Sequence, residues 1–196
     1  MILTGGYVKE LMQYYVGRAE SSMIYQKYSP FSVGCDVQGD GVLKDRVNLT
    51  MKAVVPFSGE GIPMKDRELV KDGKLMMIHG GNRFAQYLGI EPTGDFGGCK
   101  VPAGKVSLDE LKVQPYLEVV NFSDFQMNDF TGHFGGEIRL GFLYDGEKVV
   151  PVTGGSVNGN IFEAQKTLVF SKEMQVEKNF EGPRAVVMER VLVAGV

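Results

Sequence analysis

Short segments of alternating apolar and polar residues, separated by glycine-containing turns, dominate the second half of this chain. Between residues 134 and 142, Phe, Ile and Leu side chains alternate with Glu, Arg and Gly. A period of two is typical of a strand with one buried face. The chain also holds 26 glycines in 196 residues, against a usual share of roughly 7%, together with 8 tyrosines and 12 phenylalanines. This combination favours strands joined by tight turns over a helical bundle.

One long helix is expected near the start of the chain, over residues 5–20. Its apolar residues, from Val8 to Ala19, recur at spacings of three and four and form one stripe. Thr4 stands where an N-cap would lie.

Strands, turns and short helices follow in the predicted order. Two Asp-Gly pairs, Asp72-Gly73 and Asp145-Gly146, predict hairpins because they tolerate the positive φ values of a type I′ turn. Further strands are expected at 33–37, 47–53, 116–122 and 184–194, and a long loop is expected over 91–106. Three helical segments are expected: a short helix at 83–88 ended by Gly89, a helical turn at 107–111 with Ser107 and Glu110 as a capping box, and a helix from Asn160 to about residue 171. The last of these carries Ile161, Ala164 and Leu168 inward.

The fold class that follows is α+β. We expect mainly antiparallel β-sheet, or barrel-like sheets, with a few short helices packed on them. Residues 1–196 show no repeat and no linker, so one domain is expected.

Composition and charge exclude several classes of function. No window of 18 apolar residues occurs, so no transmembrane helix is expected, and the first residues do not resemble a secretory signal. The net charge is −3, so a phosphate-binding basic face, and with it nucleic-acid binding, is not expected. Cys35 and Cys99 form no CxxC pair, which favours a reducing cytoplasm.

The residues that could carry chemistry are few. His79 and His133 are the two histidines, they are far apart in sequence, and both are interpreted as polar turn residues rather than metal ligands. Cys35 is interpreted as a small buried residue. Cys99 is the better candidate for a reactive thiol, because Lys100 could lower its pKa, but no orienting partner can be identified. The edges of the predicted sheets could instead pair with an extended peptide, or they could all pair internally.

Several motifs, taken together, resemble the TldD/PmbA family. They are collinear over nearly the whole chain: FSGEGIP at 57–63 with ELVKDGKL at 68–75, RFAQYLGIEPTG at 83–94, TGHFGGEIRLGFL at 131–143, VVPV at 149–152 with GNIF at 159–162, and VLVAG at 191–195. The resemblance is to the C-terminal, third region of that family, and it is closer to the PmbA/TldE-like subunit than to the TldD subunit.

The resemblance implies a role in cytoplasmic proteolysis, in a family once described as modulators of DNA gyrase. A zinc-metallopeptidase subunit, with a His-Glu-x-x-x-His helix and a later Cys ligand, pairs there with a related subunit. This chain is expected to begin just after that helix, and it has no Cys between Ser171 and Gly182. We therefore expect no catalytic or metal residue in this chain and zinc in a partner subunit or a missing segment.

Two functions remain open from the sequence. In the first, the chain is the C-terminal domain of a PmbA/TldD-like peptidase system, inactive alone, that shapes a cavity for an unfolded peptide and docks a TldD-like subunit or a second copy. In the second, it is a non-enzymatic protein-interaction domain unrelated to proteolysis. The residues expected to line the peptide cavity are Thr131, Gly132, His133, Gly135, Gly136 and Arg139.

Overall fold

Two β-sheets and one central helix form the core of the computed structural model, which describes residues 1–195. The larger sheet has nine strands in the order β11-β14-β1-β6-β8-β10-β15, with β7 and β9 also paired to β8. Its strands are β1 (Ile2–Thr4), β6 (Tyr116–Phe122), β7 (Gln126–Met127), β8 (His133–Tyr144), β9 (Val149–Val152), β10 (Ser156–Asn160), β11 (Val169–Phe170), β14 (Ala185–Val187) and β15 (Leu192–Ala194).

The smaller sheet has six strands in the order β12-β13-β5-β2-β3-β4. They are β2 (Leu49–Lys52), β3 (Arg67–Lys71), β4 (Lys74–Leu75), β5 (Gly98–Lys100), β12 (Met174–Glu177) and β13 (Phe180–Pro183). Pairing is antiparallel except between β1 and β6 and between β5 and β13, which confirms the α+β prediction of mainly antiparallel sheet. Over residues 1–195 neither sheet closes into a barrel, so of the two forms expected it is open sheets that occur.

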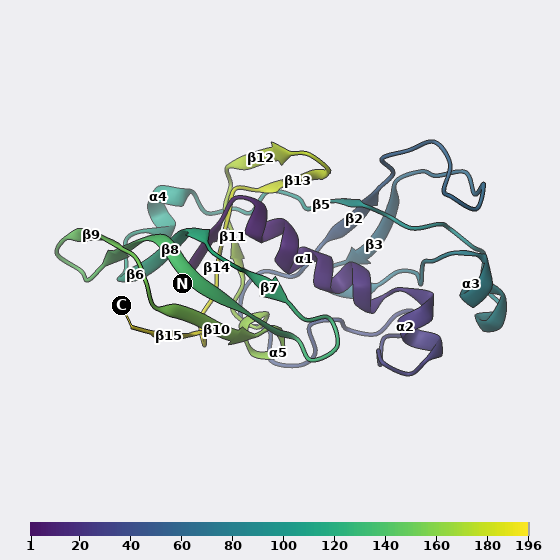
Figure 1. Ribbon diagram of the computed structural model, residues 1–196, viewed down its shortest axis with the longest axis horizontal. Helices are drawn as coiled ribbons and strands as arrows, with labels where there is room; N and C mark the ends of the chain where they lie inside the picture. The colour runs from purple at the N-terminus through teal and green to yellow at the C-terminus, as the bar shows by residue number, and fades with distance from the viewer. Residues whose placement is uncertain (196) are drawn as a thin grey trace.

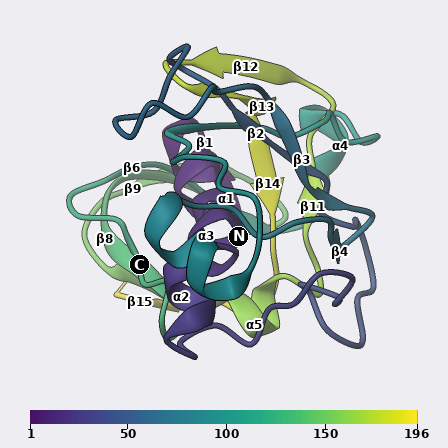
Figure 2. The same cartoon turned by 90° about the vertical axis from the view of Figure 1, so that its right-hand side faces the viewer.

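The first helix, α1 (Gly6–Arg18), lies between the two sheets (Figures 1 and 2). It contacts β1 and β7 of the larger sheet and β5 and β13 of the smaller one. The predicted apolar stripe is confirmed, since Val8, Leu11, Met12 and Tyr15 are all fully buried. The predicted N-cap is wrong. Gly5 occupies that position, and the Thr4 hydroxyl donates instead to the carbonyl oxygen of Val119 on β6.

The other helices are short: α2 (Ser21–Tyr25), α3 (Asn82–Leu88), α4 (Leu108–Leu111) and α5 (Ile161–Ala164). Gly89 ends α3 with a φ of 67°, and Ser107 and Glu110 form a capping box on α4, as predicted. In the part of the chain that the structure describes, no helix is both long and apolar enough to cross a lipid bilayer.

The helix predicted from Asn160 to about residue 171 is wrong beyond its first turn. Asn160 does cap α5 by accepting from the backbone N–H of Phe162, but α5 ends at Ala164 and β11 follows. The C-cap of the helix is Gln165, whose side chain turns into the core and is 3% exposed. There the Tyr15 hydroxyl donates to the Gln165 side-chain oxygen at 2.9 Å. Periodicity could not predict a glutamine held inside the core.

Three further predictions are wrong. Residues 33–37 form turns with one isolated pairing of Asp36 to Lys74 rather than a strand. The loop predicted over 91–106 contains β5, an inner strand of the smaller sheet. The strand can form there because Gly98 has no side chain: a Cβ atom at Gly98 would lie 2.4 Å from the carbonyl oxygen of Asn179. The strand predicted over 184–194 is two strands, β14 and β15, which are separated by a turn with Arg190 at a φ of 59°.

Candidate functional site

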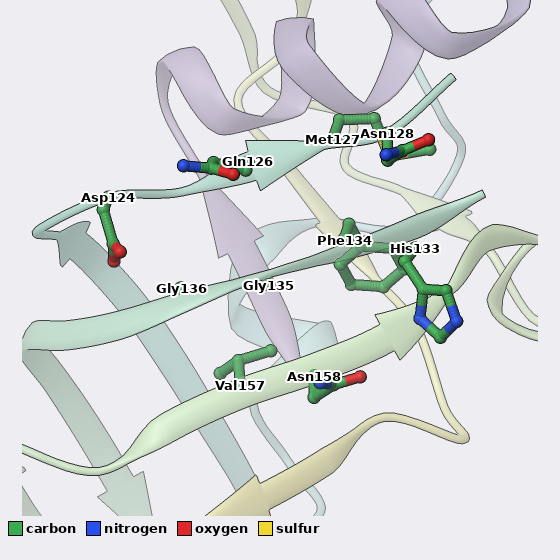
Figure 3. A pocket seen from close by; sticks show the side chains of 10 residues that line it. All are labelled: Asp124, Gln126, Met127, Asn128, His133, Phe134, Gly135, Gly136, Val157 and Asn158. Atoms are coloured by element: carbon green, nitrogen blue, oxygen red, sulfur yellow. The ribbon is translucent and has the colours of Figure 1, made fainter. Parts of the chain in front are cut away.

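A groove of about 460 Å³ lies over the ends of β7, β8 and β10 (Figure 3). The pairing register sets its shape. Gln126 of β7 and Asn158 of β10 lie directly opposite Gly135 of β8, so the two amide side chains stand on either side of a residue with no side chain. The groove is lined by Asp124, Gln126, Met127, Asn128, His133, Phe134, Gly135, Gly136, Val157 and Asn158.

The two faces of these strands differ in polarity. Phe134 and Val157 point to the core and are 3% and 2% exposed, whereas Gln126, His133 and Asn158 are exposed. The alternation of β8 and β10 thus places amide and imidazole groups on the outer face. Leu192 of β15 lies opposite Asn158 and extends the row with a side chain that is 76% exposed.

Gly135 is required by the approach of the neighbouring strand. A Cβ atom at this position would lie 2.3 Å from the carbonyl oxygen of Val157, which is far inside van der Waals contact. Gly136 is also crowded, with a hypothetical Cβ 3.0 Å from the Phe122 ring and from Cα of Phe125. The flat centre of the groove therefore follows from close backbone packing.

The turn that leads into the groove is fixed by side-chain hydrogen bonds. Asn128 accepts from the backbone N–H groups of Phe130 and Thr131, each at 3.0 Å, and Gly132 turns the chain with a φ of 73°. Asn160 donates to the carbonyl oxygen of Thr131. These contacts hold the backbone at the start of β8, where His133 lies.

Arg18 anchors the same turn from the end of α1. Arg18 is only 4% exposed, and its guanidinium donates to the carbonyl oxygens of Tyr28 at 2.6 Å and Asp129 at 3.2 Å. Burial raises the pKa of the Asp129 carboxyl, an effect that Arg18 opposes. Burial likewise raises the pKa of Tyr14, which lies under the Arg18 guanidinium, to about 12. Tyr14 therefore stays neutral at physiological pH.

The structure brings only some of the predicted cavity residues together. His133, Gly135 and Gly136 line the groove, whereas Thr131 and Gly132 lie in the turn before it. Arg139 lies further along β8, outside the groove, and its Nε donates to the Ser123 hydroxyl. The sequence reasoning missed Gln126 and Asn158. The alternation of Ser156, Asn158 and Asn160 with small apolar residues was a signal that could have found the β10 side.

The groove offers hydrogen bonds rather than acid–base chemistry. Its two titratable side chains, Asp124 and His133, lie at opposite ends (Figure 3). The Asp124 carboxylate already accepts from the backbone N–H of Glu137. Amides that both donate and accept, around a flat centre, suit a ligand rich in peptide groups.

Neither cysteine nor the second histidine adds a reactive group to the groove. Cys99 is fully buried on β5, and burial raises the pKa of its thiol to about 12, which contradicts the lowering expected from Lys100 and leaves the thiol unreactive. His79 is 4% exposed and packs against Phe96, so its interpretation as a polar turn residue is wrong as well. Within residues 1–195 no three His, Cys, Asp or Glu side chains come together to hold a metal ion. The donor set of residues 1–195 does not fit a zinc ion.

His79 gives the stability of the fold a pH dependence. Its Nε2 donates to the carbonyl oxygen of Val16 at 2.8 Å, Nδ1 has no partner, and burial lowers its pKa although Glu20 and Asp95 oppose the shift. The unfolded chain therefore binds a proton near pH 6.5 that the folded chain does not. As the pH is lowered below 6.5, we expect the free energy of unfolding to decrease by up to about 1.4 kcal/mol per pH unit.

Urea denaturation of the wild type and a His79→Gln variant between pH 7.5 and 5.5 checks this expectation. The difference between the two curves isolates His79 from other groups that titrate in this range. Parallel pH profiles for the two proteins would contradict it.

Comparison with known proteins gives consistent matches. The model of the PmbA/TldA metallopeptidase C-terminal domain matches residues 1–195. An uncharacterized protein of Methanocaldococcus jannaschii is 24% identical over 159 residues, which are 81% of this chain and 36% of that protein.

Three solved structures share the fold. A protein of Bacteroides thetaiotaomicron described as a modulator of DNA gyrase has a TM-score of 0.79 and 23% identity, over 100% of this chain and 46% of that one. A protein of Thermotoga maritima with the same description has a TM-score of 0.77 and 18% identity, over 98% and 48%. TldE from Thermococcus kodakarensis has a TM-score of 0.73 and 16% identity, over 98% and 49%. This chain spans about half the length of these solved proteins.

Proposed function

Since this chain belongs to the PmbA/TldA metallopeptidase family and corresponds to its C-terminal domain, we propose that it holds an unfolded polypeptide for proteolysis in the cytoplasm. The polypeptide binds in the groove over Gly135, and the chain docks a related subunit. A zinc ion in that subunit, or in a segment outside this chain, supplies the chemistry of bond cleavage. This chain contributes binding and orientation, as a PmbA/TldE-like component.

The observation that carries the proposal is the row Gln126, Gly135 and Asn158. The centre of the row has no side chain, so an extended backbone can lie close to the sheet. The flanking amides can donate to its carbonyl groups and accept from its N–H groups. Most backbone N–H and C=O groups of a folded protein are already paired, so few of its segments can present an extended backbone in this way. The groove therefore selects unfolded chains.

Binding of reduced, carboxymethylated casein labelled with fluorescein tests the groove. Fluorescence anisotropy with the full 196-residue chain should show binding to the wild type. It should be at least about tenfold weaker for a His133→Ala, Asn158→Ala double variant, a loss of about 1.4 kcal/mol or more. Both residues are exposed, so the fold should survive. Gln86→Ala, on the exposed side of α3, is the control.

Equal binding by the double variant would exclude the groove as the binding site. A second measurement adds a zinc-bearing subunit of the same family and follows casein cleavage. Binding with no gain of cleavage would favour the alternative, a protein-interaction domain outside proteolysis.

A further inference from the structure

The C-terminal half of β8 carries an apolar face that points away from the core. Residues Phe134 to Ile138 point inward at even positions, but the pairing with β6 shifts register at Asn121/Phe122 and again at Val119/Asn121. The irregularity on β8 reverses the alternation, so Gly141 becomes buried and the even-numbered side chains turn outward. The apolar face consists of Tyr116, Leu140, Phe142, Tyr144, Val149 and Pro151.

These side chains lie together and are not part of the core. The register places Tyr144 opposite both Tyr116 and Val149, and Phe142 opposite Pro151. Leu140 is 39% and Val149 is 52% exposed, and the three aromatic residues are half-buried. None of the six belongs to the core cluster, whereas Leu117 and Val119 on the other side of β6 do. Figure 1 shows this part of β8 at the opposite end of the molecule from α2 and α3.

The apolar face carries almost no free charge. Glu118, opposite Phe142, is paired with Lys112 at 2.7 Å, and the two side chains are 12% and 31% exposed. The Lys112 ammonium also lies 5.9 Å from the centre of the Tyr116 ring. A complementary partner must therefore present apolar side chains without a charge in the contact.

The dimensions of the face decide what kind of partner fits. Leu140 to Tyr144 span ~17 Å along the strand, and three strands are ~14 Å wide, so the face covers roughly 240 Å². A standard interface between two proteins buries about 800 Å² per partner. Protruding side chains give the face more accessible area than its flat outline, but even twice the outline area is too small for a second copy of this chain. A single α-helix, about 10 Å across and with about three turns in contact, fits it. Strand addition at the β9 edge is disfavoured by Pro151, which has no N–H to donate.

We propose that the apolar face docks one amphipathic α-helix of another polypeptide, with an uncharged stripe of leucine-sized side chains at positions i, i+3, i+4 and i+7. The helix lies along β8 with this stripe on Phe142. The proposal deepens the partner docking of the proposed function, and it uses residues outside the peptide groove.

A synthetic peptide of 18 residues provides the probe. Leucines form the stripe, Lys and Glu fill the other positions, both ends are blocked, and a second peptide of the same composition has the leucines dispersed around the helix. Fluorescence anisotropy with the full chain should show binding of the striped peptide that is at least about tenfold tighter than that of the dispersed one. Phe142→Lys should weaken it at least about tenfold, because the lysine would be buried without a partner.

Two further variants keep the test decisive. Tyr87→Lys changes an aromatic residue of α3 that is 55% exposed and should leave binding unchanged. If Phe142→Lys does not fold, Val149→Lys at the rim takes its place. Equal binding of the two peptides, or binding unaffected by the lysine on the apolar face, would overturn the proposal. So would a concentration-dependent dimer in sedimentation that the lysine abolishes, since it would assign the face to a second copy. The casein assay is independent of these variants, so failure of either proposal can be recognised separately.

Discussion

Replacing Gly135 with valine is expected to lower the free energy of unfolding by about 3 kcal/mol, at the upper end of the range for overpacking. The new Cβ would lie 2.3 Å from the carbonyl oxygen of Val157. That oxygen belongs to the backbone of β10, so it cannot rotate away as a flexible side chain would. Relief requires β10 to separate from β8, and this separation also removes the flat centre of the groove. Casein binding should therefore be lost together with stability.

The matched control is Gly59→Val in the loop before β3. A Cβ at Gly59 has no atom within 4 Å, so the same substitution should change the free energy of unfolding by well under 1 kcal/mol. Urea denaturation followed by circular dichroism measures both variants. Equal midpoints for the two would show that the strands β8 and β10 can relax around a side chain at Gly135.

Replacing Gln38 with leucine is expected to destabilise the fold by a similar amount, about 3 kcal/mol. Gln38 is 1% exposed and makes hydrogen bonds with three backbone groups. Its Oε1 accepts from Val47 N–H at 2.9 Å, and its Nε2 donates to the carbonyl oxygens of Gln165 at 3.0 Å and Asp45 at 3.2 Å. Leucine has a similar size but satisfies none of these groups, and each unpaired buried group costs about 1–3 kcal/mol.

Gln86→Leu on α3 provides the control for Gln38→Leu. Gln86 is exposed, so its replacement removes no buried partner and should leave the urea midpoint nearly unchanged. A Gln38→Leu protein as stable as the Gln86→Leu protein would mean that water reaches the three backbone groups.

Local signals predicted much of the fold. Apolar spacing predicted α1, the Asp-Gly pairs predicted the β3–β4 and β8–β9 hairpins, and the capping box predicted α4. Each of these depends on residues close together in the sequence. The predictions that are wrong depend on distant contacts. β5 is a strand because β2 and β13 lie on either side of it, and α5 stops where Gln165 is held by Tyr15 and Gln38.

The candidate site shows the same division. The motif TGHFGGEIRLGFL at 131–143, which resembles the family, pointed to the β8 side of the groove, where His133, Gly135 and Gly136 lie. The opposite sides of the groove come from β7 and β10, and their alignment with Gly135 depends on register across two turns. A single sequence does not fix that register.

The position of β1 has a consequence for the order in which the protein can be made. Residues 2–4 leave the ribosome long before residues 185–187, yet β1 pairs with β6 on one side and with β14 (Ala185–Val187) on the other. The larger sheet therefore cannot be completed until β14 and β15 have been synthesised. Until β14 emerges, one edge of β1 stays unpaired in the nascent chain, which makes folding slow and favours protection by chaperones.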